Sequence, residues 1–183
     1  MPKSLESKSK FLSLVLRHKP EEIGITLDPQ GWANLDELIQ QANAKGAELT
    51  RDVVLEIVAT NDKKRFALTS DGQRIRANQG HSAAVDLNLP PQEPPANLYH
   101  GTATRFSQSI RENGLLPGSR QHVHLSLAKA TAIEVGSRHG HPVVLTVRAS
   151  EMHRDGHEFY VSANGVWLTA SVPTRYLDFP AEV

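Results

Sequence analysis

The stretch RQHVHLS at residues 120–126 decides the fold of the second half of the chain, because polar and apolar side chains alternate along it. Alternation with a period of two is typical of a β-strand that has one polar and one apolar face. The polar face of this strand carries His122, His124 and Ser126. We therefore expect a short strand that presents imidazole and hydroxyl groups to a ligand.

The stretch LYHGT at residues 98–102 offers a second set of polar groups. A strand here runs into Gly101, where the missing side chain would let a ligand approach the backbone. His100 and Thr102 place hydrogen-bonding groups on either side of that glycine. Together, the two stretches predict a pocket for a polar, phosphate-bearing ligand.

The composition is that of an ordinary globular protein, because 183 residues with 39% hydrophobic content can form one domain or two small ones. The sequence has no long apolar run and no signal-peptide core, so we expect a cytoplasmic protein without a membrane segment. The chain has no cysteine, which excludes disulfides, thiolate metal ligands and a cysteine nucleophile. Any catalysis therefore depends on other side chains.

The net charge is zero, with 20 Lys and Arg against 20 Asp and Glu, so no overall field attracts nucleic acid. Two local basic clusters are nevertheless present. One is the run Arg17-His18-Lys19, and the other consists of Lys63, Lys64, Arg65, Arg74 and Arg76. Both clusters are suited to phosphate binding, although a solvated hairpin face and a helix C-terminus would explain the same charges.

The N-terminal half predicts three helices followed by a hairpin, which is a winged-helix pattern. Helices are expected at 4–18 before Pro20, from Asn34 to about Ala42, and after Thr50. The segments 65–69 and 74–78 flank an Asp-Gly pair that favours a hairpin turn. Such domains usually contact nucleic acid with basic residues on the phosphates. The residues expected in this role are Lys19, Lys64, Arg74 and Arg76.

A proline-rich segment separates the two halves of the chain. We predict domains at 1–80 and 98–183, joined by a linker at 81–97. In the second domain, strands are expected at 98–101, 122–126, 143–148, 159–162 and 166–170, the last two joined by an Asn-Gly turn. Helices are expected at 105–113, ended by Gly114, and at 127–138, capped by Ser126. The predicted class is α+β, with a mostly antiparallel sheet and helices packed against it.

Five short motifs together resemble the RNA 2′-phosphotransferase family. In chain order they are LRHKP at 16–20, KRF at 64–66, YHGT at 99–102, RQHVHLS at 120–126 and NGVWLT at 164–169. They occur in the family's order and cover nearly the whole chain. The resemblance implies an N-terminal winged-helix lobe that binds the RNA phosphate, followed by an ADP-ribosyltransferase-like lobe that binds NAD.

The family's reaction implies NAD as a co-substrate and no metal. An internal RNA 2′-phosphate attacks the nicotinamide ribose and expels nicotinamide, which leaves an ADP-ribosylated RNA 2′-phosphate. The ribose 2″-hydroxyl then attacks the phosphorus, giving RNA with a 2′-hydroxyl and ADP-ribose 1″,2″-cyclic phosphate. Because phosphate is already a nucleophile and nicotinamide a cationic leaving group, the protein has to position them and neutralise charge.

The resemblance assigns catalytic roles to four cationic residues. Arg17, His18 and Arg65 match the family's phosphate-engaging residues, and a planar guanidinium suits bidentate contact with phosphate. Arg120 matches the family's fourth essential cation and suits the charge that develops in the second step.

NAD contacts follow from the same resemblance. His100, Gly101 and Thr102 match the NAD-binding strand, and His124 matches the second motif histidine. Ser126, expected at a helix start, would contact phosphate or ribose. Outside this motif, His124 would be interpreted more simply as a core histidine bonded to the backbone.

Three other interpretations stay open at this point. An ADP-ribosyltransferase that acts on a protein or a nucleic-acid end would need Glu158, which we interpret as structural because an anionic acceptor needs no general base. A zinc site would draw on His122, His124, His139, His141, His153 and His157. A winged-helix nucleic-acid binder with an inert second lobe would leave the YHGT and HVH motifs unexplained. We expect a monomer, and tRNA is one RNA substrate that the family implies.

Overall fold

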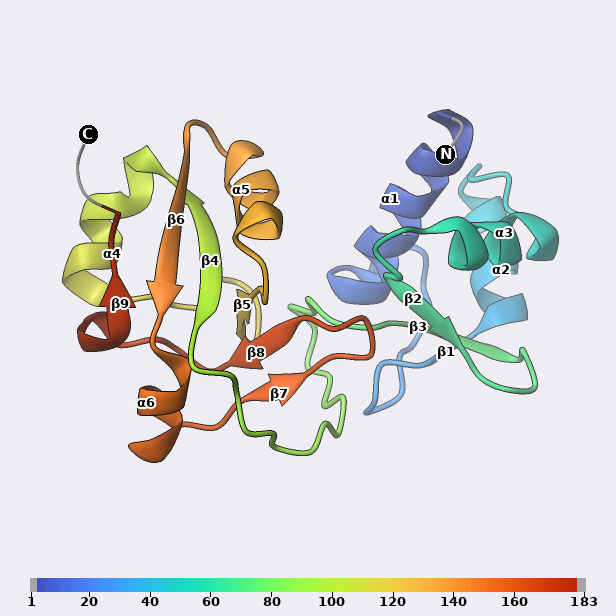
Figure 1. The fold of residues 1–183 in the computed structure, drawn as a ribbon. Helices are drawn as coiled ribbons and strands as arrows, with labels where there is room; N and C mark the ends of the chain where they lie inside the picture. The colour runs from blue at the N-terminus through green and yellow to red at the C-terminus, as the bar shows by residue number, and fades with distance from the viewer. Residues whose placement is uncertain (1–2, 181–183) are drawn as a thin grey trace. The chain divides into compact units, whose positions relative to one another are not determined.

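The structure is a computed structural model that describes residues 3–180 and divides into two compact units at the Asn88–Leu89 bond. Both units combine helices with small antiparallel sheets, so the α+β class is confirmed (Figure 1). None of the helices described between residues 3 and 180 has the length and apolar composition needed to cross a membrane.

The N-terminal unit contains three α-helices and three strands. The helices are α1 (Lys3–Arg17), α2 (Leu35–Ala44) and α3 (Arg51–Thr60), with a 3-10 turn, η1 (Pro20–Glu22), after the first. The strands are β1 (Ala33–Asn34), β2 (Phe66–Leu68) and β3 (Arg74–Ala77). All three predicted helices and the hairpin are confirmed, and the first helix ends one residue before His18.

Side-chain caps start α2 and α3 where the sequence predicts them. The Asn34 side chain accepts a hydrogen bond from the Glu37 N–H at 2.9 Å, and the Thr50 hydroxyl accepts one from the Val53 N–H at 3.2 Å. Each cap satisfies a backbone donor that the first turn of a helix leaves open.

The sheet of the N-terminal unit has the order β1-β3-β2, with both pairs antiparallel. One face buries Ile75 and Ala77 of β3 together with Phe66 of β2, and α1 supplies Leu12 and Leu16 to the same core. The opposite face of β3 carries Arg74 and Arg76, because successive side chains of a strand point to opposite faces. The unit therefore has one apolar and one basic sheet face.

The segment 78–86, called the strap below, is held on the N-terminal unit. Its residues Ser82 and Ala83 donate backbone hydrogen bonds to the Arg17 carbonyl at 2.9 and 3.1 Å. The Asp86 N–H donates to the Pro29 carbonyl at 2.8 Å. Composition suggests a linker from residue 81 onward, whereas the first part of that segment is hydrogen bonded to the end of α1 and to the loop before β1.

The C-terminal unit contains two three-stranded antiparallel sheets of order β4-β6-β9 and β5-β8-β7. The strands are β4 (Leu98–Ala103), β5 (Val123–Leu125), β6 (Pro142–Val147), β7 (Tyr160–Val161), β8 (Trp167–Thr169) and β9 (Leu177–Asp178). The helical elements are η2 (Thr104–Phe106), α4 (Ser107–Asn113), α5 (Lys129–Ser137), α6 (Ala149–Arg154) and η3 (Thr174–Tyr176). The five predicted strands are confirmed, while α6 and β9 were not predicted.

Helix α5 lies alongside β4 in Figure 1, and two glycines allow the close approach. A Cβ atom on Gly101 would lie 1.7 Å from the Ala132 carbonyl oxygen, and one on Gly136 would lie 2.5 Å from the Thr102 carbonyl oxygen. The explanation predicted for Gly101, space for a ligand, is therefore wrong. Its missing side chain leaves room for the backbone of α5.

Candidate functional site

In the N-terminal unit, Arg17 and His18 are fixed by the strap. Arg17 is the last residue of α1, and its carbonyl accepts the two strap hydrogen bonds described above. The His18 Nδ1 atom lies 2.9 Å from the Ser82 hydroxyl oxygen. Ser82 therefore contacts two of the three predicted phosphate-binding residues, Arg17 through its backbone and His18 through its side chain.

The other end of the strap holds the segment that carries Arg65. The Asn78 N–H donates to the Arg65 carbonyl at 2.8 Å, and the Asn78 side-chain amide donates to the Lys64 carbonyl at 2.6 Å. Lys64 adopts a positive φ of 42°, which this pair of bonds stabilises. The strap thus bonds to both segments of the N-terminal unit that carry predicted phosphate-binding residues.

His81 lies in the middle of the strap and was missed by sequence reasoning. Its side chain is 2% exposed. Its pKa is lowered from 6.5 to about 4, chiefly by burial and then, in decreasing order, by the charges of Arg17, Arg76 and His18. The imidazole is consequently neutral near pH 7, in a neighbourhood rich in cationic side chains. The signal available in the sequence was a histidine close to the basic β3, inside a segment that composition assigns to a linker.

Several buried polar atoms on and beside the strap lack a hydrogen-bond partner within residues 3–180. They are Nε of Arg76, Oδ1 of Asn78, Oε1 of Gln79 and Nε2 of His81. Buried polar atoms are nearly always hydrogen bonded in folded proteins. Of these atoms, the Nε–H of Arg76 can donate to an anion, whereas the two amide oxygens can only accept. The preference of this part of the N-terminal unit for an anionic ligand therefore comes from its cationic side chains, Arg17 and Arg76.

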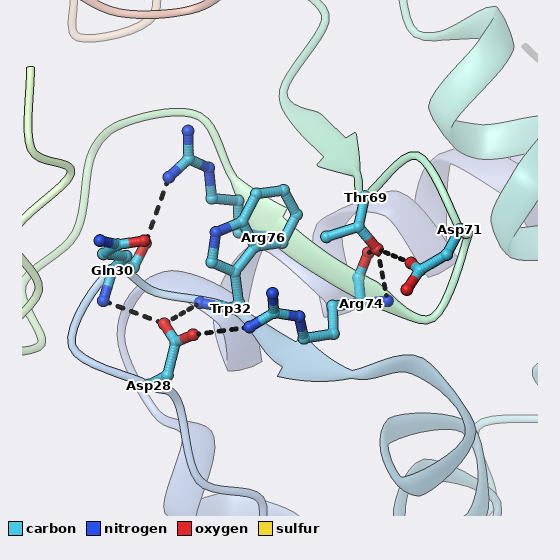
Figure 2. Close-up of polar contacts among 7 residues, drawn as sticks. All are labelled: Asp28, Gln30, Trp32, Thr69, Asp71, Arg74 and Arg76. Atoms are coloured by element: carbon cyan, nitrogen blue, oxygen red, sulfur yellow. Dashed lines mark hydrogen bonds and ion pairs between the residues drawn. The ribbon is translucent and has the colours of Figure 1, made fainter.

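The predicted RNA-binding residues differ in how they are held. Lys19 is exposed, with its Nζ atom 3.8 Å from a Glu22 carboxylate oxygen. Arg74 forms an ion pair with Asp28 at 3.1 Å, and the guanidinium of Arg76 lies 4.6 Å from the centre of the Trp32 ring (Figure 2). Arg74 and Arg76 therefore share one sheet face with an indole.

In the C-terminal unit, three motif residues form one hydrogen-bonded chain. Arg120 Nη1 lies 3.2 Å from His124 Nδ1, and His100 Nδ1 lies 3.0 Å from the His124 carbonyl oxygen. Because a guanidinium only donates, His124 Nδ1 accepts and its proton is assigned to Nε2. Because a carbonyl only accepts, His100 Nδ1 donates, which leaves Nε2 of the neutral ring as an acceptor.

The charge states within this chain follow from its surroundings. Burial lowers the pKa of His100, the hydrogen bond to the His124 backbone raises it, and Arg120 lowers it. Partial burial also lowers the pKa of Arg120, and the charge of Arg138 lowers it further. The chain therefore combines a neutral His100 with a guanidinium close to a second cation, which suits an anionic ligand.

Thr102 and Ser126 are placed by the sheets. Thr102 is 6% exposed within β4. The Ser126 N–H donates to the Tyr99 carbonyl at 2.8 Å, and its carbonyl accepts from the Tyr99 N–H at 2.9 Å, which pairs the end of β5 with β4. The predicted cap at Ser126 is therefore wrong. Helix α5 begins at Lys129, with Ala128 in the N-cap position and no side-chain cap.

Two of the alternative interpretations involve residues outside this hydrogen-bonded chain, namely Glu158 and all of the zinc-site histidines except His124. The His122 ring lies 5.8 Å from the Tyr160 ring, and the Tyr160 hydroxyl donates to an exposed Glu158 carboxylate at 2.8 Å. Among residues 3–180, no three His, Asp or Glu side chains are grouped so that they could hold a metal ion. The zinc interpretation therefore finds no ligand set in the described part of the chain.

Comparison with known proteins gives consistent matches over almost the full sequence. Residues 3–171 match the RNA 2′-phosphotransferase, Tpt1 / KptA family. A "Probable RNA 2′-phosphotransferase" of Rhodopirellula baltica is 60% identical over 179 residues, which are 97% of this chain and 97% of that protein. Proteins of the same name from Pseudomonas aeruginosa and Agrobacterium fabrum are 59% and 57% identical, and cover 96% and 95% of this chain and 97% and 94% of their own lengths.

These relatives are named as transferases, and the similarity extends over both units. The chain is therefore an enzyme of the transferase class. It belongs to the RNA 2′-phosphotransferase, Tpt1 / KptA family, which confirms the resemblance inferred from the five motifs.

Proposed function

We propose that the enzyme removes an internal 2′-phosphate from RNA by transferring it to NAD. A phosphate oxygen forms a bond to the anomeric carbon of the nicotinamide ribose while the glycosidic bond to nicotinamide breaks. The 2″-hydroxyl of that ribose then bonds to phosphorus and loses its proton, while the bond from phosphorus to the RNA 2′-oxygen breaks and that oxygen is protonated. The products are nicotinamide, RNA with a 2′-hydroxyl, and ADP-ribose 1″,2″-cyclic phosphate.

The phosphate is proposed to bind to Arg17, His18 and Arg65 in the N-terminal unit. The strap supports this assignment, because its hydrogen bonds to the backbone of Arg17 and Arg65 fix the points from which both side chains extend. Charge-assisted hydrogen bonds to phosphate contribute roughly 1.5–3 kcal/mol each. Loss of one arginine is therefore expected to lower the rate at least about tenfold.

NAD is proposed to bind at β4 and β5 of the C-terminal unit. The hydrogen-bonded chain Arg120–His124–His100 is the observation that carries this proposal, because it joins residues from two separate family motifs. Neutral His100 can accept a hydrogen bond from a ribose hydroxyl through Nε2, and His124 can donate through Nε2. Arg120 is proposed to stabilise the charge that develops on the phosphate oxygens in the second step.

The finer fold assignments belong to the same proposal. Three helices with a three-stranded sheet that ends in the β2–β3 hairpin support a winged-helix lobe that binds the RNA phosphate. Two small antiparallel sheets with flanking helices support an ADP-ribosyltransferase-like lobe that binds NAD.

A short RNA with one internal 2′-phosphate tests the proposal. The enzyme should convert it to the 2′-hydroxyl form only when NAD is present, with one nicotinamide released for each phosphate lost. Phosphate loss without NAD would identify a hydrolytic phosphatase and refute the mechanism. Release of nicotinamide with the RNA phosphate retained as a stable ADP-ribosylated product would indicate an ADP-ribosyltransferase.

A further inference from the structure

The basic face of the β1-β3-β2 sheet carries an indole that the core does not use. Ala33 of β1 pairs with Ile75 of β3, and both are buried beneath the sheet. Trp32, which precedes Ala33, therefore falls on the opposite face with Arg74 and Arg76. Trp32 is partly exposed and belongs to no hydrophobic cluster among the described residues. A large, flat aromatic ring thus lies partly exposed on the outer sheet face, beside two guanidinium groups.

The turn before β1 holds this indole in place. One carboxylate oxygen of Asp28 accepts hydrogen bonds from the N–H groups of Gln30 and Trp32, both at 2.9 Å, and the Asp28 N–H donates to the Trp32 carbonyl at 2.9 Å. Gly31 completes the turn with a φ of +83°, a conformation that favours glycine. Figure 2 shows Asp28 at the centre of these contacts. The indole is therefore presented on a closed, hydrogen-bonded turn.

The two arginines beside the indole are in different charge environments. Arg74 donates to the second carboxylate oxygen of Asp28 at 3.1 Å, and its guanidinium lies 5.8 Å from the centre of the Trp32 ring. Arg76 lies closer, at 4.6 Å, but forms no ion pair within residues 3–180 and reaches only the Gln30 carbonyl, at 3.5 Å. Arg74 forms the ion pair with Asp28 and stabilises the turn, whereas Arg76 lies beside the ring and interacts with Asp28 only through longer-range electrostatics.

The indole also lies near the residues proposed to bind the RNA phosphate. A Cβ atom on Gly31, next to Trp32, would lie 3.3 Å from the Nε2 atom of His81 on the strap. The charges of Arg17, Arg76 and His18 all act on the His81 imidazole. The aromatic ring, Arg76 and the phosphate-binding residues therefore surround the same part of the strap within the N-terminal unit.

We propose that Trp32 is a stacking platform for a nucleobase adjacent to the 2′-phosphorylated nucleotide, and that Arg76 binds the phosphodiester next to that base. This inference rests on the proposed function, since it assigns a second RNA contact to the same enzyme. An aromatic ring beside an arginine is a common device for holding single-stranded RNA, because every base has a face that can stack. The platform makes the enzyme prefer an unpaired nucleotide next to the 2′-phosphate and tolerate any base there.

Kinetics with modified RNA test the platform. Three RNAs are compared in the presence of NAD: the intact 2′-phosphorylated strand, and strands that lack the base on the 5′ or the 3′ side of the phosphorylated nucleotide. Base stacking predicts that Trp32→Ala lowers kcat/KM on the intact strand about 5- to 100-fold, mainly through KM. With one of the two abasic strands, kcat/KM of the wild-type enzyme should fall by a similar factor. Trp32→Ala should show the same kcat/KM on that strand as on the intact strand. Trp32→Phe should recover most of the loss.

The matched control is Phe106→Ala, because Phe106 is an exposed aromatic ring with an arginine stacked 4.8 Å from its centre, in the C-terminal unit. This variant should retain wild-type kinetics on all three strands. If Trp32→Ala lost the same factor on intact and abasic RNA, Trp32 would support the fold only, and the platform would be refuted. Equal kcat/KM for the wild type and Trp32→Ala on intact RNA would refute it as well.

A binding measurement without NAD separates this inference from the proposed function. The chain has two tryptophans, and the second, Trp167, is buried, so RNA that stacks on Trp32 should quench its fluorescence. Quenching should be lost in Trp32→Phe and weakened in Arg76→Gln. Quenching by 2′-phosphorylated RNA without any turnover would leave the platform standing and refute the proposed function. Turnover of the intact strand without quenching would refute the platform and leave the proposed function standing.

Discussion

Replacing His81 by glutamine should make the protein less sensitive to acid. The His81 imidazole is buried among Arg17, Arg76 and His18, and its pKa is lowered from 6.5 to about 4. Between about pH 6.5 and pH 4, the unfolded chain therefore binds a proton at His81 that the folded protein does not bind. The free energy of unfolding consequently falls as the pH drops below 6.5, the pKa of this histidine in the unfolded chain. From these two pKa values, the loss is about 2 kcal/mol between pH 7 and pH 5, and about 3 kcal/mol by pH 4.

Urea unfolding at about pH 7 and about pH 5 gives two free energies of unfolding for each variant. The quantity compared between the wild type and His81→Gln is the difference between these two values. The difference should be smaller by about 2 kcal/mol in His81→Gln than in the wild type, whatever the substitution costs at neutral pH. His139→Gln is the matched control, since it removes an exposed histidine. An unchanged pH dependence in His81→Gln would show that His81 does not sit neutral among these cations, and would refute the reasoning.

Three further predictions concern the C-terminal unit. In a urea titration, Gly101→Ala should lower the free energy of unfolding by about 3 kcal/mol or more, because the new Cβ would lie 1.7 Å from a backbone oxygen. The control is Gly118→Ala, which has open space around the new Cβ and a φ of +64°, and should lower the free energy of unfolding by only about 1 kcal/mol. Arg120→Ala should accumulate ADP-ribosylated RNA, visible by gel or mass spectrometry, and finding only unreacted substrate would argue against a second-step role. Glu158→Gln should keep kcat/KM within about twofold of the wild type, because the side-chain hydrogen bond described for this exposed carboxylate is the one from the Tyr160 hydroxyl. A large loss of kcat/KM would favour the ADP-ribosyltransferase alternative.

Features fixed by neighbouring residues were predictable from the sequence. The Asn34 and Thr50 caps depend on contacts three residues away, and both form as predicted. The alternation at 120–126 also holds, since Val123 and Leu125 are buried. The resemblance to the family succeeded for a related reason, because it rested on short contiguous motifs.

Features set by distant segments could not be read locally. Gly101 faces the Ala132 carbonyl, a partner that only the packing of α5 against β4 supplies. Ser126 resembles a helix cap in sequence, but both of its backbone groups pair with Tyr99, which keeps it in an extended conformation. A residue that forms both bonds of a β-bridge is part of the sheet, so the helix begins three residues later.

The strap shows how a segment that resembles a linker can position a site. Arg17 and Arg65 are far apart in the sequence, and the strap bonds to the carbonyl of each, through Ser82 and Ala83 at one end and Asn78 at the other. These bonds involve the backbone of the two arginines and not their guanidinium groups. The same bonds can form when either side chain is replaced. In Arg17→Lys the backbone of residue 17 should therefore keep its position, and the variant should lose only the planar guanidinium that can donate two hydrogen bonds to one phosphate. The position of each cation is thus set by the fold, and its chemistry by its side chain.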